Sequence, residues 1–360
     1  MNSRIRIKLT LEDGTIYNGW SFGAPVPAAG EVVFNTAMTG YPESLTDPSY
    51  KGQILCLTYP LVGNYGAPAL SEENNLYSFY ESSSIHISGL IVSDYSSEYS
   101  HWNASESLGE WLGRNNIPGV YGIDTRALTK RIREKGVMLG KLEPEGSVTD
   151  FYDPNRTNLV AGVSTREIKR YGTGKYRIML VDCGVKYNII RNLLKRDTTI
   201  IRVPWDYDYS REEYDGLFLT NGPGDPKMCS ITIEHIKESF SDTKPIFGIC
   251  LGNQLMALAS GADTYKLKYG HRSHNQPVIK AGTDKACITS QNHGYAVNNE
   301  TLPAEWEPLF INLNDNTNEG MRHRTRPFFS TQFHPEASGG PTDTDFLFDE
   351  FIENIRLAKS

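Results

Sequence analysis

The sequence is poor in cysteine and has no long apolar run, and both shortages narrow the classes of protein to consider. Its five cysteines are scattered through 360 residues, and none belongs to a Cys-x-x-Cys pair. This argues against a zinc ribbon and a thioredoxin-like site, and it predicts reduced, mostly buried thiols in a cytoplasmic protein. No stretch approaches the roughly 18 consecutive apolar residues of a membrane span, and the first residues lack the apolar core of a signal peptide.

The sequence also lacks an excess of positive charge and the common nucleotide-binding motifs. The chain has 36 Lys and Arg against 43 Asp and Glu, a net charge of −7, which disfavours a surface for nucleic acid or an anionic membrane. It contains no G-x4-G-K-[ST], and no G-x-G-x-x-G follows a predicted strand, so no ATP or dinucleotide site is evident. A chain of 360 residues usually exceeds one hydrophobic core, so two domains are expected.

The pattern of predicted elements changes halfway along the chain. Residues 1–150 alternate β-branched runs with turn residues, which predicts a smaller α+β domain with helices near 106–112 and 124–135. The polar, irregular stretch at 151–175 is predicted to be a linker. In 176–360 strands alternate with helices, which predicts an α/β domain with a mostly parallel sheet flanked by helices.

Cys250 stands between Gly248 and Gly252 where a predicted strand turns at once into a predicted helix. This arrangement resembles the nucleophile elbow of hydrolases, in which glycines permit strained dihedrals and close packing. The helix beginning at Leu251 directs its free N–H groups toward the sulfur, which favours a thiolate, and the Leu251 N–H suits an oxyanion hole. For this motif alone, a buried structural cysteine is an equally good interpretation.

His334 and Glu336 flank Pro335 after another predicted strand. A residue before proline favours an extended backbone, and residues two apart in an extended segment face the same side. Glu336 could therefore orient the imidazole while His334 takes a proton from Cys250, which is the logic of a catalytic triad. His293 is the rival base, but it is expected to lack a nearby carboxylate partner.

Two further motifs carry weaker signals. Residues 221–226 read NGPGDP, a turn in which Gly222 and Gly224 must supply the backbone donors because proline has no N–H. His271 and His274 form an H-x-x-H, but further metal ligands are not evident, which favours a surface loop or the rim of a substrate site over a metal site. Since the carboxyl ends of parallel strands meet at one edge, NGPGDP, Cys250 and His334 are predicted to converge.

Taken in order, the segments NGPGDP, FGICLGNQ, SQNHGYAV and QFHPE resemble a class I, triad-type glutamine amidotransferase. In the first half, GEVVFNTAMTGYPESLTDPSY, TYPLVGNYG and GIDTRALTKRIREKG resemble the N-terminal domain of the small subunit of carbamoyl-phosphate synthetase. The resemblance covers nearly the whole chain. Because the chain stops soon after the glutaminase motifs, it resembles a free-standing subunit more than a fused multienzyme.

The resemblance implies a role for each matching residue. Cys250 would attack the side-chain amide of glutamine, with His334 as general base and acid and Glu336 orienting it, and the backbones of Leu251 and Gly222 would hold the oxyanion. The remaining positions that it implies for glutamine binding are Ser49, Gly224, Gln254, Asn292, Gly294 and Tyr295. The family usually has histidine where Asn253 stands, phenylalanine where Tyr295 stands, and a different loop at 270–277, but none of these departures touches the triad.

The resemblance also implies partners. This chain would need no cofactor or metal, because ammonia would pass to a large subunit that binds ATP, Mg2+ or K+ and bicarbonate and makes carbamoyl phosphate for pyrimidine and arginine biosynthesis. The implied partners are thus that large subunit and L-glutamine, with no nucleic acid and no membrane. The competing classes are an independent cysteine hydrolase acting on γ-glutamyl peptides and a catalytically silent binding subunit, which the presence of both Cys250 and His334 disfavours.

Overall fold

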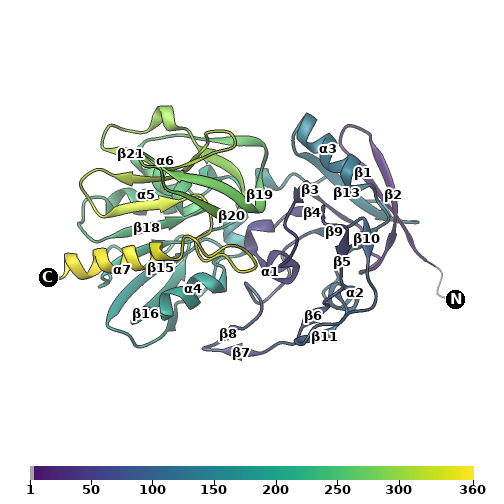
Figure 1. Ribbon diagram of the computed structural model, residues 1–360, viewed down its shortest axis with the longest axis horizontal. Coiled ribbons are helices and arrows are strands. Elements are labelled where there is room, and N and C mark those ends of the chain that lie inside the picture. Colours follow the sequence, from purple (N-terminus) through teal and green to yellow (C-terminus); the bar gives the residue numbers. More distant parts are fainter. Residues whose placement is uncertain (1–3) are drawn as a thin grey trace. The chain divides into compact units, whose positions relative to one another are not determined.

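The computed structural model describes residues 4–360, which form two compact units, the first ending at Arg156 and the second beginning at Thr157 (Figure 1). The division falls within the segment 151–175 that was predicted to be a linker. Strand β14 (Lys169–Tyr171) nevertheless pairs with β16 (Thr198–Pro204), so the end of that segment is part of the second unit's sheet.

The N-terminal unit is built on a closed barrel with the strand order β1-β13-β3-β4-β9-β12-β2. These strands are β1 (Arg6–Leu11), β2 (Ile16–Ser21), β3 (Ala28–Asn35), β4 (Gln53–Leu57), β9 (Gly89–Ile91), β12 (Gly119–Tyr121) and β13 (Met138–Pro144). Strand β1 shows how such a strand buries one face, because Ile7, Leu9 and Leu11 are buried between exposed or half-buried polar residues.

Short elements surround the barrel. The helices are α1 (Tyr41–Thr46), η1 (Pro48–Tyr50), α2 (Leu108–Arg114), α3 (Thr125–Lys135) and η2 (Pro154–Arg156), and the short strands are β5 (Leu61–Val62), β6 (Ala67–Pro68), β7 (Glu72–Glu73), β8 (Leu76–Tyr77), β10 (Asp94–Tyr95) and β11 (Ala104–Glu106). Both helices predicted for this half are present. Helix α3 begins where the Asp124 carboxylate accepts the Ala127 N–H at 2.9 Å and ends at Gly136, whose φ is 104°.

The C-terminal unit contains a 10-stranded sheet in the order β14-β16-β15-β17-β18-β23-β22-β21-β19-β20. Its strands from β16 to β23 in that order are parallel, as the sequence predicted for this domain. The remaining bounds are β15 (Tyr176–Asp182), β17 (Gly216–Leu219), β18 (Ile246–Ile249), β19 (Thr264–Lys280), β20 (Ala286–Val297), β21 (Trp306–Asn312), β22 (Asn318–His323) and β23 (Phe328–Thr331).

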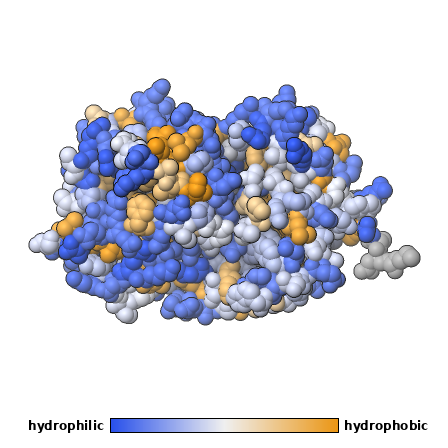
Figure 2. All heavy atoms as spheres, in the orientation of Figure 1, coloured by the Kyte–Doolittle hydropathy of each residue, from blue (hydrophilic) through white to orange (hydrophobic). Residues whose placement is uncertain are grey.

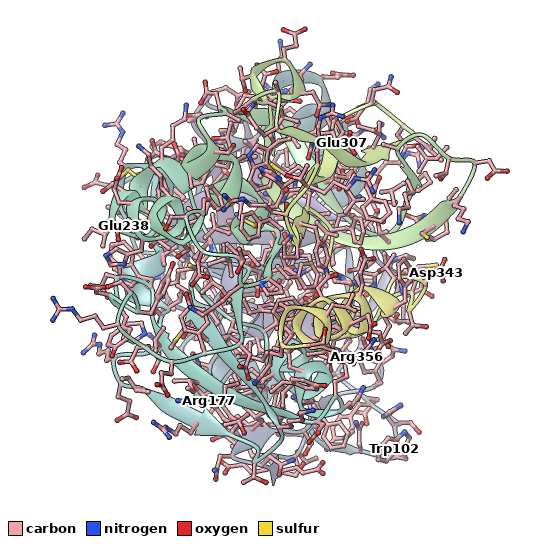
Figure 3. All side chains as sticks on the ribbon, turned by 90° about the vertical axis from the view of Figure 1, so that its left-hand side faces the viewer. Trp102, Arg177, Glu238, Glu307, Asp343 and Arg356 are labelled. Atoms are coloured by element: carbon pink, nitrogen blue, oxygen red, sulfur yellow. The ribbon has the colours of Figure 1, made fainter. Side chains whose placement is uncertain are left out.

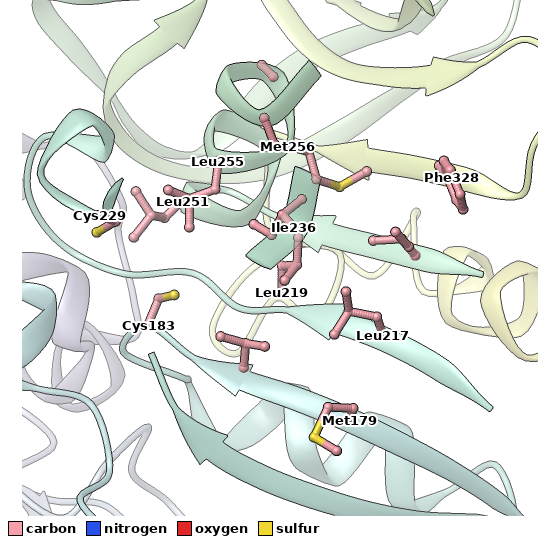
Figure 4. Packing of buried hydrophobic residues seen from close by; sticks show 14 of the residues in the cluster. Met179, Cys183, Leu217, Leu219, Cys229, Ile236, Leu251, Leu255, Met256 and Phe328 are labelled. Atoms are coloured by element: carbon pink, nitrogen blue, oxygen red, sulfur yellow. The ribbon is translucent and has the colours of Figure 1, made fainter. Parts of the chain in front are cut away.

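Helices and buried apolar side chains pack against this sheet. The helices are η3 (Val160–Gly162), α4 (Tyr187–Leu194), η4 (Pro226–Met228), α5 (Ser230–Ser239), α6 (Leu251–Ser260), η5 (Asn299–Thr301) and α7 (Phe346–Ala358). Figure 4 shows Leu251, Leu255 and Met256 of α6 pointing toward the strand that carries Leu217 and Leu219. Burial of this apolar face fixes α6, and with it the residue just before the helix, on the parallel strands.

The antiparallel half of the sheet, from β22 to β20, was not predicted. His271 and His274, expected in a surface loop or at the rim of a substrate site, lie in the 17-residue strand β19, and only 8% of His271 is exposed, so the surface-loop expectation was wrong. Strand β19 is rich in polar residues and its pairing with β20 shifts register twice, so it lacks the regular alternation from which strands are predicted.

The surface of the protein is mostly polar. Figure 2 shows hydrophilic residues over much of the visible face, with hydrophobic residues in scattered groups. In Figure 3 the exposed Glu238, Asp343 and Arg356 lie at the outside of the C-terminal unit. Across residues 4–360, the helices are too short or too polar to cross a bilayer. All five cysteines are free, and only Cys287 is not buried, as the sequence predicted.

Candidate active site

Cys250 is the turn residue between β18 and α6, and its backbone is strained. Its φ of 55° and ψ of −101° lie outside the regions that side-chain-bearing residues usually adopt. The Cys250 N–H donates to the carbonyl of Thr331 at 2.7 Å, which ties the turn to the end of the neighbouring strand β23. A buried cysteine held in a strained strand-to-helix turn fits the nucleophile elbow better than an ordinary structural cysteine.

The glycines around Cys250 act through close packing. A Cβ on Gly252 would lie 2.4 Å from the Leu219 carbonyl oxygen, and one on Gly222 would lie 2.1 Å from the Cys183 carbonyl oxygen and 2.8 Å from a Leu251 methyl carbon. Neither position accepts a larger residue without movement of the backbone. The turn at Gly222 therefore packs directly against the start of α6, next to Leu251.

His334 and Glu336 form a buried pair. The Nδ1 atom of His334 lies 2.7 Å from Oε1 of Glu336, and the two side chains are 2% and 0% exposed. Burial alone lowers the pKa of His334, but the charges of Glu336 and Cys250 and the hydrogen bond with Glu336 outweigh it and raise that pKa to about 10. Because Nδ1 is engaged by Glu336, Nε2 is left for the thiol.

The backbone around this pair differs from the expectation. His334 is extended and pairs with Ser290, whose carbonyl accepts the His334 N–H at 2.9 Å, but Pro335 and Glu336 form a turn closed by a hydrogen bond from Ala337 N–H to His334 O at 3.1 Å. The carboxylate reaches the ring through this turn and not along a straight strand.

Lys186, which the sequence analysis missed, completes the buried chain of charges. Its ammonium donates to Oε1 of Glu336 at 2.9 Å and to the Ala337 carbonyl at 2.7 Å, and its side chain is 7% exposed. Burial alone raises the pKa of Glu336, but Lys186 and then His334 hold it at about 2. The available signal was position: like Cys250, Lys186 follows the carboxyl end of a parallel strand.

We expect Lys186→Met to lower stability by about 3 kcal/mol, since breaking one partner of a buried ion pair leaves the other charge buried. Urea unfolding of both proteins measures this difference. Lys359→Met is the matched control, because Lys359 pairs with Asp215 at 2.6 Å on the surface and its loss is expected to cost about 1 kcal/mol or less. Equal losses in the two variants would contradict a structural role for the Lys186–Glu336 pair.

The residues predicted to bind glutamine divide between the two units. Asn292, Gly294 and Tyr295 lie in β20, where the Cys250 thiol donates to the Asn292 carbonyl at 3.8 Å and the Gln254 amide donates to the Tyr295 carbonyl at 2.9 Å. The Gly224 backbone has a φ of 88° in the turn after β17. Ser49 lies in η1 of the N-terminal unit. A role in binding glutamine stays a prediction for all these residues, as do the triad roles.

Asn253 and His293 are the sequence neighbours of Gln254 and Asn292. Asn253, which departs from the family pattern, is fully buried and bonds with Gln332 and Ser330 at 3.1 and 2.7 Å, so it is held within the protein core. His293 was said to lack a carboxylate, which is wrong, because Oε1 of Glu319 lies 3.7 Å from its Nε2 atom. Glu319 is remote in sequence from His293, and only the pairing of the antiparallel strands brings it near.

Comparisons with known proteins agree with this architecture. Residues 179–354 match the family model of the class-I glutamine amidotransferases, and residues 9–142 match that of the CPSase domain of the carbamoyl-phosphate synthase small chain. The chain is 53% identical, over 98% of its length, to the mitochondrial carbamoyl-phosphate synthase (ammonia) of Aquarana catesbeiana, and 51% identical, also over 98%, to that of Homo sapiens. It is 52% identical over 98% of its length to the multifunctional protein CAD of Squalus acanthias.

The chain spans 24% of the length of the first two relatives and 16% of the third. The N-terminal barrel and the C-terminal α/β unit correspond to the two matched domains in the same order. The chain belongs to the carbamoyl-phosphate synthase small-chain family, in which a CPSase domain precedes a class-I glutamine amidotransferase domain.

Proposed function

We propose that this protein hydrolyses L-glutamine to glutamate and ammonia, and that the ammonia serves the synthesis of carbamoyl phosphate. The observation that carries the proposal is the strained, buried Cys250 beside the buried chain His334–Glu336–Lys186, within a class-I glutamine amidotransferase domain. Two of the relatives are named for ammonia. The presence of a nucleophile and a base in this chain favours glutamine as its own source of nitrogen.

The proposed reaction begins when His334 holds the proton of Cys250 and the thiolate attacks the amide carbon of glutamine. The backbone N–H groups of Leu251 and Gly222 would stabilise the oxyanion that forms. His334 then gives its proton to the leaving nitrogen, which departs as ammonia and leaves a glutamyl thioester on Cys250. Water, deprotonated by His334, attacks the thioester and releases glutamate and the thiol.

In this mechanism Glu336 and Lys186 act on the histidine and not on glutamine. The carboxylate accepts a hydrogen bond from the Nδ1–H group of His334, which directs Nε2 to the sulfur, and its negative charge stabilises the imidazolium. The lysine keeps that carboxylate ionised in a buried position. The ionised carboxylate thus favours the imidazolium form of His334 that the first step produces.

The test is an assay of ammonia and glutamate released from L-glutamine by the purified chain. Equal amounts of both products are expected, and the same assay with γ-glutamyl peptides should give much less product. Preferential cleavage of the peptides would favour the independent cysteine hydrolase.

We also expect a stable complex with a larger, ATP-using synthetase chain that takes up the ammonia. Such a persistent complex should bury well over about 1,200 Å2. Glutamine hydrolysis should be slow for the chain alone and faster when the partner has ATP and bicarbonate bound, because uncoupled hydrolysis wastes glutamine. Size-exclusion chromatography with ammonia release, with and without the co-expressed partner, measures both properties. A chain that elutes alone and turns over at an unchanged rate would contradict this proposal.

The finer assignments belong to the same proposal. Mg2+ or K+, ATP and bicarbonate would bind to the large chain, and the carbamoyl phosphate would serve pyrimidine or arginine biosynthesis. A cytoplasmic location stays a prediction, since two of the relatives are named as mitochondrial.

A further inference from the structure

Three ligand-type side chains meet in the antiparallel half of the C-terminal sheet. His271 of β19, His293 of β20 and Glu319 of β22 each bring one nitrogen or oxygen atom to within 4.8 Å of the others. The side chains are buried, with 8%, 4% and 0% of each residue exposed. Buried charged and polar groups usually have complete hydrogen bonding, so an unpartnered atom in this cluster indicates a missing ligand.

His293 has acceptor oxygens at both ends of its ring. Its Nδ1 lies 2.9 Å from the Tyr295 carbonyl oxygen, while its Nε2 lies 3.3 Å from Oε1 of Gln291 and 3.7 Å from Oε1 of Glu319. A neutral imidazole carries one N–H. Whichever nitrogen holds the proton, the lone pair of the other faces an oxygen lone pair, and a cation at that nitrogen would remove the conflict.

The orientation of the Gln291 amide is fixed by its other neighbour. The Thr289 hydroxyl donates its only hydrogen to the Gln276 carbonyl at 2.9 Å, so the hydroxyl oxygen must accept from the Gln291 amide nitrogen, which lies 3.2 Å away. The amide oxygen therefore points to His293. Rotating the amide would relieve the conflict at His293 only by creating one at Thr289.

His271 shows the arrangement that metal-bound histidines usually have. One ring nitrogen, Nε2, lies 2.8 Å from a carboxylate oxygen of Asp315, and the other, Nδ1, lies 3.3 Å from Oε1 of Glu319. In His293 the corresponding outer partner is the Tyr295 carbonyl. An outer carboxylate or carbonyl fixes the tautomer of a ligating histidine and leaves its inner nitrogen free for the metal.

Glu319 supplies a second sign that the cluster is incomplete. Its Oε1 atom accepts from the Asn312 amide at 3.1 Å, but its Oε2 atom is buried and has no hydrogen-bond partner within residues 4–360. A protonated His271 could satisfy Oε1, yet it would leave both Oε2 and the lone pair of His293 without a positive partner. A divalent cation bound by His271, His293 and both oxygens of the Glu319 carboxylate would satisfy all of them.

We propose that His271 Nδ1, His293 Nε2 and the Glu319 carboxylate form a site for a divalent transition metal of the zinc type, with an open fourth position. Two histidines and one carboxylate are a common zinc set, and ligand atoms around tetrahedral zinc lie about 3.4 Å apart. The two ring nitrogens lie 3.3 and 3.7 Å from Glu319 Oε1, close to this spacing, and all three ligand atoms lie within 4.8 Å of one another.

This site is separate from the proposed triad but linked to the same strand. His293 follows Asn292, whose carbonyl oxygen accepts a hydrogen bond from the Cys250 thiol. The carbonyl oxygen of Tyr295, two residues further on, accepts hydrogen bonds from the Gln254 amide and from the His293 ring. Metal binding would therefore fix the segment of β20 that borders Cys250. The inference does not depend on glutamine hydrolysis, because it concerns metal binding itself.

The experiment titrates Zn2+ into the full chain after EDTA treatment and dialysis, in the Cys250→Ser background so that the thiol is not a competing ligand. One equivalent should bind with a dissociation constant of about 1 µM or lower, and Co2+ should give the absorption of a tetrahedral site without a sulfur charge-transfer band. Glu319→Gln should weaken Zn2+ binding at least about 100-fold, and Asp315→Asn, which alters an outer partner, about 10- to 100-fold.

His235→Gln is the matched control, since His235 is a half-buried histidine of α5 whose Nδ1 also meets a carbonyl, that of Tyr207 at 3.1 Å. It should bind Zn2+ as the Cys250→Ser protein does. Circular dichroism checks the folding of each variant. If Glu319→Gln fails to fold, the Zn2+ affinity of Asp315→Asn tests the proposal, because the Asp315 side chain is partly exposed and its replacement is less disruptive. The proposal is overturned if Cys250→Ser binds less than one equivalent, or if the folded variants of Glu319 or Asp315 bind Zn2+ unchanged.

Discussion

Replacing Cys250 with serine is expected to lower glutamine turnover at least about 1,000-fold, as loss of a nucleophile does in other hydrolases that form covalent intermediates. A hydroxyl at neutral pH is far less ionised than a thiol, so the first attack on the amide would almost cease. The fold should persist, because serine is of similar size and the backbone of the turn is held by the Cys250 N–H bond to Thr331. Ammonia release from glutamine measures the loss.

Two controls separate this result from general damage. Cys287→Ser changes a half-buried thiol in β20 and is expected to keep full activity. Carbamoyl phosphate synthesis from added ammonia, measured with the co-expressed partner, should survive in Cys250→Ser. Glutamine turnover like that of the unchanged protein would remove Cys250 from the mechanism.

His334→Ala is expected to cost about as much activity as Cys250→Ser, because nucleophile and base act as one unit. Glu336→Ala should cost less, since it removes an orienting charge at 2.7 Å from the ring while the base itself remains. Steady-state kinetics of the three variants, each checked for folding by circular dichroism, give the comparison.

The control for this series is His293→Ala, which alters the rival histidine. It is expected to affect glutamine binding more than the chemical step, because its ring holds the Tyr295 carbonyl beside the Gln254 amide. A severe loss of kcat in His293→Ala with a mild loss in His334→Ala would transfer the role of base to His293.

The sequence alone determined the elements with strong local signals. Buried strands read as apolar runs, helix α3 had its cap at Asp124 and its stop at Gly136, and the glycines around Cys250 marked a turn between strand and helix. These signals suffice because periodicity, capping and turn chemistry act over a few residues. The parallel order of the core then follows from the alternation of strands and helices, which brings the ends of several strands to one edge.

The tertiary structure decided whatever depends on pairing between distant segments. Lys186 and Glu336 are 150 residues apart, and neither shows locally that it meets an opposite charge. The antiparallel strands that join His271, His293 and Glu319 are polar and irregular in register. They lack the alternation of apolar and polar residues from which strands are predicted. The physical reason is the same in both cases: a buried charge is tolerated only beside its partner, and which partner it meets is fixed by the packing of the whole sheet.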